Sequence, residues 1–347
     1  MSEQFDFIAI GDVVTDAFVN LDSVKIIEQD RGPDLMAVRY GDKIPFNWHK
    51  IIAGVGNSAN AAVSATRLGL NTAYVGNVGG DRYGEEQIQA LQDNNIDTQF
   101  VTVHAGEKSN YHYVLLYKAD RTILVKHTEF DYKLPEIGTP KWMYLSSMAE
   151  NTLPHHMEIA DYLEANESVK LAFQPGTFQM KLGLEKLSRI YKNSELFFCN
   201  VEEAKRILYA FMPKLEESVE KIETEEGRKE AVKILLVEMK KQGPTIPVIT
   251  DGPDGAFVLD TDDSVYWCPM YPDPKPPIDR TGAGDSFSST FTAIYAETGD
   301  VQEALLIGPL NSMNVVQYVG AQEGLQTRDQ IQVHLDNAPE FYKVEKI

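Results

Sequence analysis

Residues 279–291, DRTGAGDSFSSTF, combine a run of minimal side chains with a carboxylate directly after it. A ligand can approach the backbone of Gly282, Ala283 and Gly284, whose amides open a predicted helix and form an anion site. Asp285 falls in the first turn of that helix, where its carboxylate stays ionised within reach of a bound anion. A base beside an anion hole suits phosphoryl transfer, which depends on positioning a nucleophile and stabilising charge. The same spacing also fits a glycine-rich loop followed by a helix-capping aspartate.

The flanking residues predict that this loop runs into a helix. The preceding segment is kept extended by four prolines, Pro272, Pro274, Pro276 and Pro277. After the glycines, apolar residues recur at helical spacing: Phe287, Phe291, Ile294 and Tyr295. Gly299 can end the helix, because glycine adopts the left-handed conformation common after a last turn. The anion site would therefore lie at the N-terminus of a helix.

The loop matches the pattern D-x-T-G-A-G-D through Asp279, Thr281, Gly282, Ala283, Gly284 and Asp285. It resembles the signature of the ribokinase-like, or PfkB, family of carbohydrate and nucleoside kinases, and the resemblance covers nearly the whole chain. The resemblance implies an α/β fold with three α/β/α layers, a mostly parallel central sheet and a small β lid. It also implies ATP as co-substrate, Mg²⁺ as cofactor and Asp285 as the catalytic base. Several relatives hold K⁺ in this loop, which makes Asp279 a candidate for a monovalent cation, although Arg280 stands where threonine is common.

Charge and composition restrict the partners. The chain has 347 residues, of which 43% are hydrophobic, so it can bury a sizeable core. Its net charge of -20 argues against nucleic acid or an anionic membrane as the main partner, since both need a basic face. Two cysteines, Cys199 and Cys268, argue against a disulfide scaffold and favour a reducing cytoplasm. The N-terminus lacks the features of a leader, and no stretch approaches the ~18 apolar residues of a membrane span.

Two carboxylates follow the first predicted strand. Residues 5–10 form an apolar run that ends at Gly11, and Asp12 and Asp16 come next. Open α/β sheets bind ligands at the carboxyl ends of their strands, so these side chains could hold sugar hydroxyls or a metal. A turn aspartate and a helix-capping aspartate would look the same. The family resemblance assigns acceptor binding to Asp16 first and Asp12 second.

Residues 53–69, AGVGNSANAAVSATRLG, predict a small-residue loop that enters a helix. They satisfy G-x-G-x-x-A, so a dinucleotide site is an alternative. A dinucleotide site should directly follow the first strand, and an acidic residue should stand at the end of the next strand. Here the next predicted strand, residues 74–78, is followed by two glycines instead, Gly79 and Gly80. The segment instead resembles the family's Gly/Asn signature, which assigns binding of the acceptor's hydroxyls to Gly56 and Asn60. Val55 departs from the glycine that is commoner in this signature.

The nucleotide side is indicated by weaker signals. Asn200 and Glu203 follow a predicted strand at N-x-x-E spacing and could present oxygens to hydrated Mg²⁺, or could simply form a capping box. The resemblance ties this motif to Mg²⁺ and phosphate. It also makes Thr250 and Gly252 candidate nucleotide contacts, where an ordinary hairpin is the alternative. Asn311, on a second apolar helix, is the last candidate nucleotide contact.

Strands and helices alternate from residue 143 onward, which predicts βαβ units and a parallel sheet. Two β-rich insertions interrupt the first half. We expect residues 17–52 and 106–128 to form the lid, and residues 1–16, 53–105 and 129–347 the main domain. By the resemblance, the lid covers the substrate and can form a homodimer interface; a plain surface hairpin is the alternative.

The sequence thus predicts an ATP-dependent kinase that transfers the γ-phosphoryl group to a hydroxymethyl group of a sugar or nucleoside. No P-loop motif G-x-x-x-x-G-K-[ST] and no protein-kinase motif set occurs. The alternatives are an inactive sugar or nucleotide sensor of the same fold and, less favoured, a dinucleotide-dependent oxidoreductase. VGNSAN contains no basic residue, which favours a neutral acceptor unless Lys43, Arg82 or Arg121 reaches in from the lid. The histidines are expected to be solvated or packed, not metal ligands.

Overall fold

The fold is built around a sheet that is parallel except at one edge. We analysed a computed structural model, which describes residues 4–29, 34–118, 120–222 and 227–347. Ten strands in this part of the chain form the sheet: β1 (Phe7–Ile10), β6 (Thr72–Gly79), β7 (Val101–His104), β10 (Trp142–Leu145), β11 (Lys170–Phe173), β12 (Ser194–Asn200), β13 (Ile246–Thr250), β14 (Ala256–Leu259), β15 (Val265–Cys268) and β16 (Glu345–Lys346). Their order is β16-β15-β14-β13-β12-β11-β10-β1-β6-β7. From β13 through β1 to β7, neighbouring strands pair in parallel. The pairs β13–β14, β14–β15 and β15–β16 are antiparallel.

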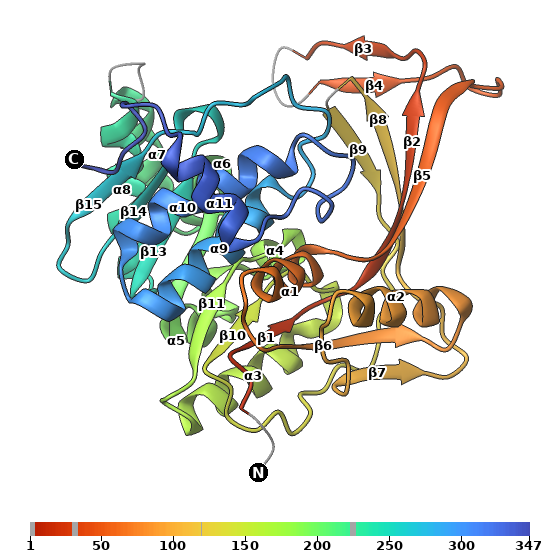
Figure 1. Cartoon of the computed structure of the whole chain (residues 1–347), viewed down its shortest axis with the longest axis horizontal. Helices are drawn as coiled ribbons and strands as arrows, with labels where there is room; N and C mark the ends of the chain where they lie inside the picture. Colours follow the sequence, from red (N-terminus) through yellow and green to blue (C-terminus); the bar gives the residue numbers. More distant parts are fainter. Residues whose placement is uncertain (1–3, 30–33, 119, 223–226) are drawn as a thin grey trace.

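Helices cover both faces of this sheet, which gives the three layers that the sequence predicts (Figure 1). One face carries α1 (Asn57–Arg67), α2 (Arg82–Asp93), α9 (Ala283–Thr298), α10 (Val301–Val315) and α11 (Arg328–Asp336). The other carries α3 (Leu153–Ala165), α4 (Thr177–Lys186), α5 (Ser188–Asn193), α6 (Val201–Phe211), α7 (Pro213–Ile222) and α8 (Arg228–Lys241). Two short 3₁₀ turns complete the set, η1 (Glu150–Thr152) and η2 (Gly252–Asp254). Strands β1 and β10 are buried along their whole length, which explains their uninterrupted apolar sequences FIAI and WMYL.

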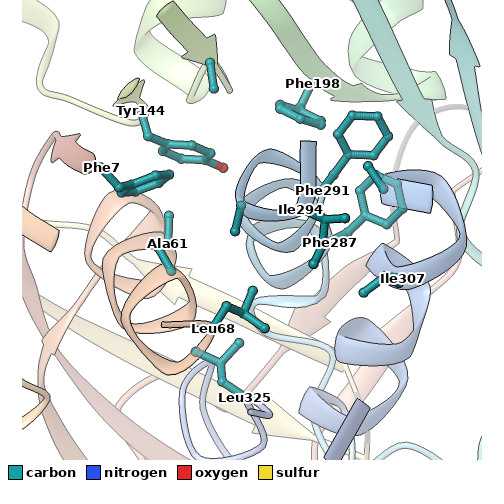
Figure 2. Packing of buried hydrophobic residues seen from close by; sticks show 14 of the residues in the cluster. Phe7, Ala61, Leu68, Tyr144, Phe198, Phe287, Phe291, Ile294, Ile307 and Leu325 are labelled. Atoms are coloured by element: carbon teal, nitrogen blue, oxygen red, sulfur yellow. The ribbon is translucent and has the colours of Figure 1, made fainter. Parts of the chain in front are cut away.

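Helix α9, which begins in the candidate anion loop, lies between α1 and α10. Figure 2 shows its apolar side chains packed towards the sheet and α10. The Phe291 ring lies 5.5 Å from that of Phe198 on β12, in an edge-to-face arrangement. Left-handed glycines bound the helix, Gly282 at its N-terminus and Gly299 at its C-terminus. The predicted end at Gly299 is therefore confirmed, and the anion loop is anchored to a helix buried on several sides.

A second, smaller sheet projects from the main body (Figure 1). Its order is β5-β2-β8-β9, with β2 (Val14–Leu21), β5 (Phe46–Val55), β8 (Tyr111–Tyr117) and β9 (Asp120–Leu124); β3 (Lys25–Ile27) and β4 (Leu35–Ala37) form a separate pair. Phe18, Val114 and Leu116 form its small core, against Ile52 and Val319. This sheet is built from the two predicted insertions and the residues beside them. The lid boundaries at residues 17–52 and 106–128 stay a prediction.

Two local predictions were wrong. Strand β5 runs from Phe46 to Val55, so the loop predicted from residue 53 begins three residues later. Asp16 lies inside β2 and not in the connection that follows β1. Helix α4 is interrupted at Gly183, whose φ is 82°. Helix α10 ends at Val315.

Candidate active site

A cavity of about 480 Å³ opens at the carboxyl ends of the parallel strands. Four of its lining residues end, or follow within two residues, four neighbouring strands: Ser147 (β10), Gln174 (β11), Asn200 (β12) and Thr250 (β13). Strand β1 pairs with β6 on one side and β10 on the other, so the chain order reverses here. Such reversals leave a crevice in which open α/β sheets bind ligands. The cavity is thus where the fold predicts a small-molecule site.

Asp285 lies in this cavity and is 8% exposed. Three side-chain amides donate to its carboxylate: Asn57 Nδ2 to Oδ1 at 2.8 Å, Gln174 Nε2 to Oδ1 at 3.1 Å and Asn60 Nδ2 to Oδ2 at 2.9 Å. Burial raises the pKa of the Asp285 carboxyl, while these amides and the charge of Arg121 oppose the rise. A raised pKa makes this carboxylate a better proton acceptor than an exposed aspartate. The geometry therefore suits a general base.

Two further contacts orient these amides. Tyr144 Oη donates to Gln174 Oε1 at 2.5 Å, which leaves the amide nitrogen of Gln174 to face the carboxylate. Gln322 Nε2 donates to Asn60 Oδ1 at 3.1 Å, with the same effect on Asn60. Gln322 also donates to Gly54 O at 2.9 Å, so it links α1 to the loop after α10. Asn57, Gln174 and Gln322 are site residues that the sequence did not indicate, because each lies far from Asp285 along the chain.

The loop predicted to be an anion hole lies at the N-terminus of α9. Gly282 has a φ of 80° and a ψ of 3° and precedes the first helical residue, Ala283. The first amides of a helix have no partner within it. That of Ala283 makes a long contact, 3.5 Å, to Arg280 O, and that of Gly284 lies at the cavity, where a ligand could accept from it. A Cβ added to Gly282 would lie 2.3 Å from Ala321 Cβ, whereas one added to Gly284 would come no closer than 3.7 Å to Gln174. Close packing thus demands glycine at 282, and open space lies beside 284.

Asp279 is fully buried beneath this loop. Its Oδ1 accepts from Thr281 N at 2.9 Å and Thr281 Oγ1 at 2.6 Å, and its Oδ2 accepts from Gly320 N at 2.9 Å. The carboxylate therefore shapes the loop through contacts within the chain. Arg280 points instead towards the smaller sheet, where its guanidinium lies 3.7 Å from Asp120.

Asn200 and Glu203 form the capping box that the sequence allowed. Asn200 Oδ1 accepts from Glu203 N at 2.8 Å, and Glu203 Oε2 accepts from Asn200 N at 3.0 Å. Both side chains also line the cavity, so capping does not remove them from the site. Burial raises the pKa of the Glu203 carboxyl, and the negative charge of Asp285 adds to this. Among the described residues, no group of three or more His, Cys, Asp or Glu side chains could hold a metal by itself.

A smaller hollow of about 100 Å³ shares Thr250 and Gly284 with the main cavity and also contains Gly252. Its far wall is formed by Pro309 and Ser312 of α10. The structure does not bring Asn311 to either space, which corrects its prediction as a nucleotide contact. Asn311 is fully buried, and both ends of its amide have partners in the core: Nδ2 donates to Thr290 Oγ1 at 2.8 Å, and Oδ1 accepts from Gln326 N at 2.9 Å. Its position on α10 therefore directs the side chain into the core.

The two aspartates near β1 have different surroundings. Asp16 lines the cavity, and its Oδ1 lies 3.3 Å from His112 Nδ1 but has no well-aligned hydrogen bond within the described part of the chain. Asp12 is 3% exposed and lies behind the cavity wall, where it accepts from Tyr132 Oη at 2.7 Å and faces His127 Nδ1 at 2.9 Å. Asp12 therefore contacts His127, which lines the cavity. Gly56 also lines the cavity, and its backbone packs too closely against Asp12 O for a side chain.

The sequence also missed two histidines and a lysine on the cavity wall, His112, His127 and Lys181. Of the three basic residues suggested from the lid, Arg121 lines the cavity, whereas Arg82 pairs with Glu86 on α2. The alternation along β9 could have indicated Arg121, since it shares a face with Ile123 and Val125, which also line the cavity. No comparable local signal marked the histidines.

Comparison with known proteins defines the class: the chain is similar over most of its length to kinases of small molecules. It is 26% identical over 267 residues to an uncharacterized sugar kinase of Archaeoglobus fulgidus, covering 75% of this chain and 97% of that protein. It is 24% identical over 338 residues to a nucleoside kinase of Methanothermobacter thermautotrophicus, covering 94% and 93%. A putative ribokinase II from E. coli, in complex with ATP and Mg²⁺, has the same fold, with a TM-score of 0.69 and 16% identity over 96% of this chain and 99% of that one.

The chain belongs to the pfkB family of carbohydrate kinases, which it matches over residues 41–328. It is therefore a phosphotransferase that acts on an alcohol group, and its fold is ribokinase-like. The dinucleotide alternative loses its structural basis, because Gly54 lies in β5 of the smaller sheet and Gly56 follows that strand, not the first strand of the main sheet. No helix among the described residues is long and apolar enough to cross a membrane.

Proposed function

We propose that this kinase transfers the γ-phosphoryl group of ATP to a hydroxymethyl group of a sugar or nucleoside, with Asp285 as the base. The observation that carries the proposal is the buried Asp285 carboxylate, held by three amides beside the N-terminus of α9. The choice of ATP as donor is supported by the ATP complex of the E. coli putative ribokinase II, which has the same fold. The choice of acceptor is supported by the relatives named sugar kinase and nucleoside kinase.

In the proposed reaction the acceptor hydroxyl lies against Asp285 and its oxygen attacks the γ-phosphorus. The bond from that phosphorus to the bridging oxygen breaks, ADP departs, and the hydroxyl proton passes to the carboxylate. Charge on the transferred group is stabilised by the amides of the anion hole, Gly282, Ala283 and Gly284. Asp16, Gly56 and Asn60 would hold the acceptor, and Asp12 would position His127. Thr250 and Gly252 would contact the nucleotide in the smaller hollow.

Mg²⁺ fits the cavity at Glu203. The partly buried carboxylate has a raised pKa, partly because Asp285 is near, and a divalent cation would relieve that repulsion. With no complete protein cage among the described residues, the ion would be held by Glu203, directly or through water, beside Asn200 and the phosphates. When bound, it would neutralise phosphate charge.

Glu203→Gln tests this assignment without disturbing the fold. Glutamine at this position preserves a capping box, so α6 should remain intact by circular dichroism. We expect the Mg²⁺ concentration for half-maximal rate to rise about 10-fold or more, because a carboxylate ligand is lost. Glu202→Gln, a change at the neighbouring exposed glutamate, is the matched control. Identical Mg²⁺ titrations for the wild type and both variants would remove Glu203 from the metal site.

We also propose that Asp279 and its loop can hold K⁺, because the carboxylate keeps unused lone pairs after its three internal hydrogen bonds. Initial rates in KCl and in tetramethylammonium chloride at equal ionic strength test this. Equal rates in the two salts would exclude a K⁺ requirement. A cytoplasmic location suits the two buried, unpaired cysteines, and cell fractionation would check it.

A homodimer through the smaller sheet is supported by a row of apolar side chains on its outer face. Ile51, Ala17, Tyr113 and Leu124 lie opposite one another in register across β5, β2, β8 and β9. Three of them are more than half exposed, Ile51 (56%), Tyr113 (52%) and Leu124 (54%). Such a patch favours association. Ile51→Glu should convert a dimer into a monomer in light scattering; a wild type that is monomeric at high concentration would contradict the proposal.

The proposed function is tested by ADP release from Mg·ATP with ribose, fructose, adenosine, cytidine and fructose 6-phosphate. Turnover with one acceptor is expected. ATP binding without turnover on any acceptor would favour the sensor alternative, which the intact base and anion hole disfavour.

A further inference from the structure

One wall of the cavity is a continuous set of side chains that phosphoryl transfer itself does not require. His112 Nδ1 lies 3.3 Å from Asp16, and the His112 ring lies 5.2 Å from that of His127. His127 in turn faces Asp12 through Nδ1 at 2.9 Å. Since an ionised carboxylate only accepts, Nδ1 of His127 carries a proton, and its Nε2 is left for a ligand. The wall therefore presents imidazole groups whose orientation is set by buried carboxylates.

This wall continues to a lysine on α4. The Phe178 ring lies 5.8 Å from His127, and Lys181 Nζ lies 5.1 Å above the centre of the same ring. Lys181, Phe178 and His127 all line the cavity. Lys181 belongs to the acceptor side, because this chain of contacts leads from it to Asp16 and not to the nucleotide hollow.

The smaller sheet contributes a second positively charged side chain to the cavity, Arg121. Arg121 is on the cavity face of β9, and its charge acts on the Asp285 carboxyl. Within the part of the chain that the structure describes, neither Arg121 nor Lys181 forms an ion pair. The whole chain has 52 acidic and 32 basic side chains, so carboxylate partners are abundant. Two unpaired cations at one cavity are therefore best explained by an anion that is supplied from outside.

Unused hydrogen-bonding capacity lies beside these cations. Asp16 Oδ1 and His112 Nε2 are buried polar atoms that find no hydrogen-bond partner among the described residues. Such atoms cost stability unless a ligand or water satisfies them. A carboxylate acceptor such as Asp16 suits ligand hydroxyls, whereas the cations and imidazoles suit negatively charged oxygens.

We propose that the acceptor is an anionic polyhydroxylated molecule, a sugar that carries a carboxylate or a phosphate. Its anionic group lies between Lys181, His127 and Arg121, its hydroxyls contact Asp16 and His112, and its reacting hydroxyl lies at Asp285. This inference rests on the proposed kinase function. It replaces the neutral acceptor that the sequence favoured, because the cations come from α4 and β9 and not from the VGNSAN segment.

Matched neutral and anionic acceptors test the proposal in ADP-release kinetics: glucose with gluconate, galactose with galactonate, and fructose with fructose 6-phosphate. At least one anionic member should exceed its neutral partner about 10-fold or more in kcat/KM, and the preferred pair identifies carboxylate or phosphate. Lys181→Met should raise KM for that acceptor about 10- to 100-fold with little change in kcat, because a charge-assisted contact is lost. Lys186→Met, on an exposed lysine of the same helix outside the cavity lining, should leave KM unchanged.

Two results would overturn the anionic acceptor. One is a neutral sugar as the best acceptor, with a KM that Lys181→Met does not alter. The other is an equal loss of kcat for both members of a pair in Lys181→Met and Arg121→Met, which would place both cations on the transferred phosphoryl group.

Calorimetric titration separates this inference from the proposed function. If no acceptor turns over, the kinase function is contradicted, while saturable binding of gluconate, galactonate or fructose 6-phosphate that weakens in Lys181→Met would still support an anion site. Absence of such binding by all three would overturn it.

Discussion

Asp285→Asn should leave a folded protein that binds ATP but has lost about 10²- to 10⁴-fold in kcat, the usual contribution of a general base. The amide has nearly the same shape as the carboxylate but cannot accept the hydroxyl proton. KM for the acceptor should change much less than kcat, because the loss is confined to the transition state. ADP release measured at saturating acceptor, with folding checked by circular dichroism, decides the result.

Asp300→Ser is the matched control, since it removes a carboxylate from the start of the neighbouring helix α10. Asp300 Oδ1 accepts from Gln302 N at 2.8 Å, and serine retains this capping ability. The control should keep the wild-type kcat. Should Asp285→Asn also keep it, Asp285 would be no more than a capping residue.

The pH dependence of kcat/KM should reflect the ionisation of the Asp285 carboxyl. Burial raises the pKa of Asp285 above its ordinary value of 3.8. Only the ionised form can accept a proton, so kcat/KM should rise with pH through the raised pKa and then level off. The acid limb of the wild type should therefore lie above pH 3.8, and the residual activity of Asp285→Asn should lack that limb.

Gly282→Ala should damage both stability and catalysis. A left-handed alanine costs about 1–2 kcal/mol, and forcing a methyl group into close packing costs about 1–3 kcal/mol more. The new Cβ would lie 2.3 Å from that of Ala321, so the segment after Gly320 must move. That segment holds Asp279 through Gly320 N and Asn60 through Gln322. We therefore expect a loss of about 2–5 kcal/mol in unfolding free energy and at least 10-fold in kcat.

Gly299→Ala separates backbone strain from packing. Gly299 is the left-handed glycine at the other end of α9, with a φ of 67° and no atom within 4 Å of an added Cβ. Its replacement should cost only about 1–2 kcal/mol and leave kcat unchanged. Urea unfolding and ADP release on both variants make the comparison, and equal effects of the two substitutions would show that contact with Ala321 is unimportant.

The sequence by itself determined the features that depend on neighbours along the chain. The anion loop and Asp285 are adjacent, so their relation to the start of α9 follows from helix geometry. Asn200 and Glu203 are three residues apart, and their reciprocal contacts were foreseeable for the same reason. The alternation of strands and helices likewise predicted βαβ units and a parallel sheet, because each hydrophobic period is typical of one kind of element.

Only the tertiary structure decided what surrounds Asp285. Asn57, Asn60 and Gln174 reach it from α1 and the end of β11, across more than a hundred residues of chain. The pairing of Asp12 with His127 and the meeting of Lys181 with Arg121 at one cavity also join distant segments. Such contacts depend on the order of strands in the sheet and on how the smaller sheet packs over it. No local periodicity encodes that strand order. Neighbouring positions on a helix also face different sides, which is why the side chain of Asn311 lies in the core.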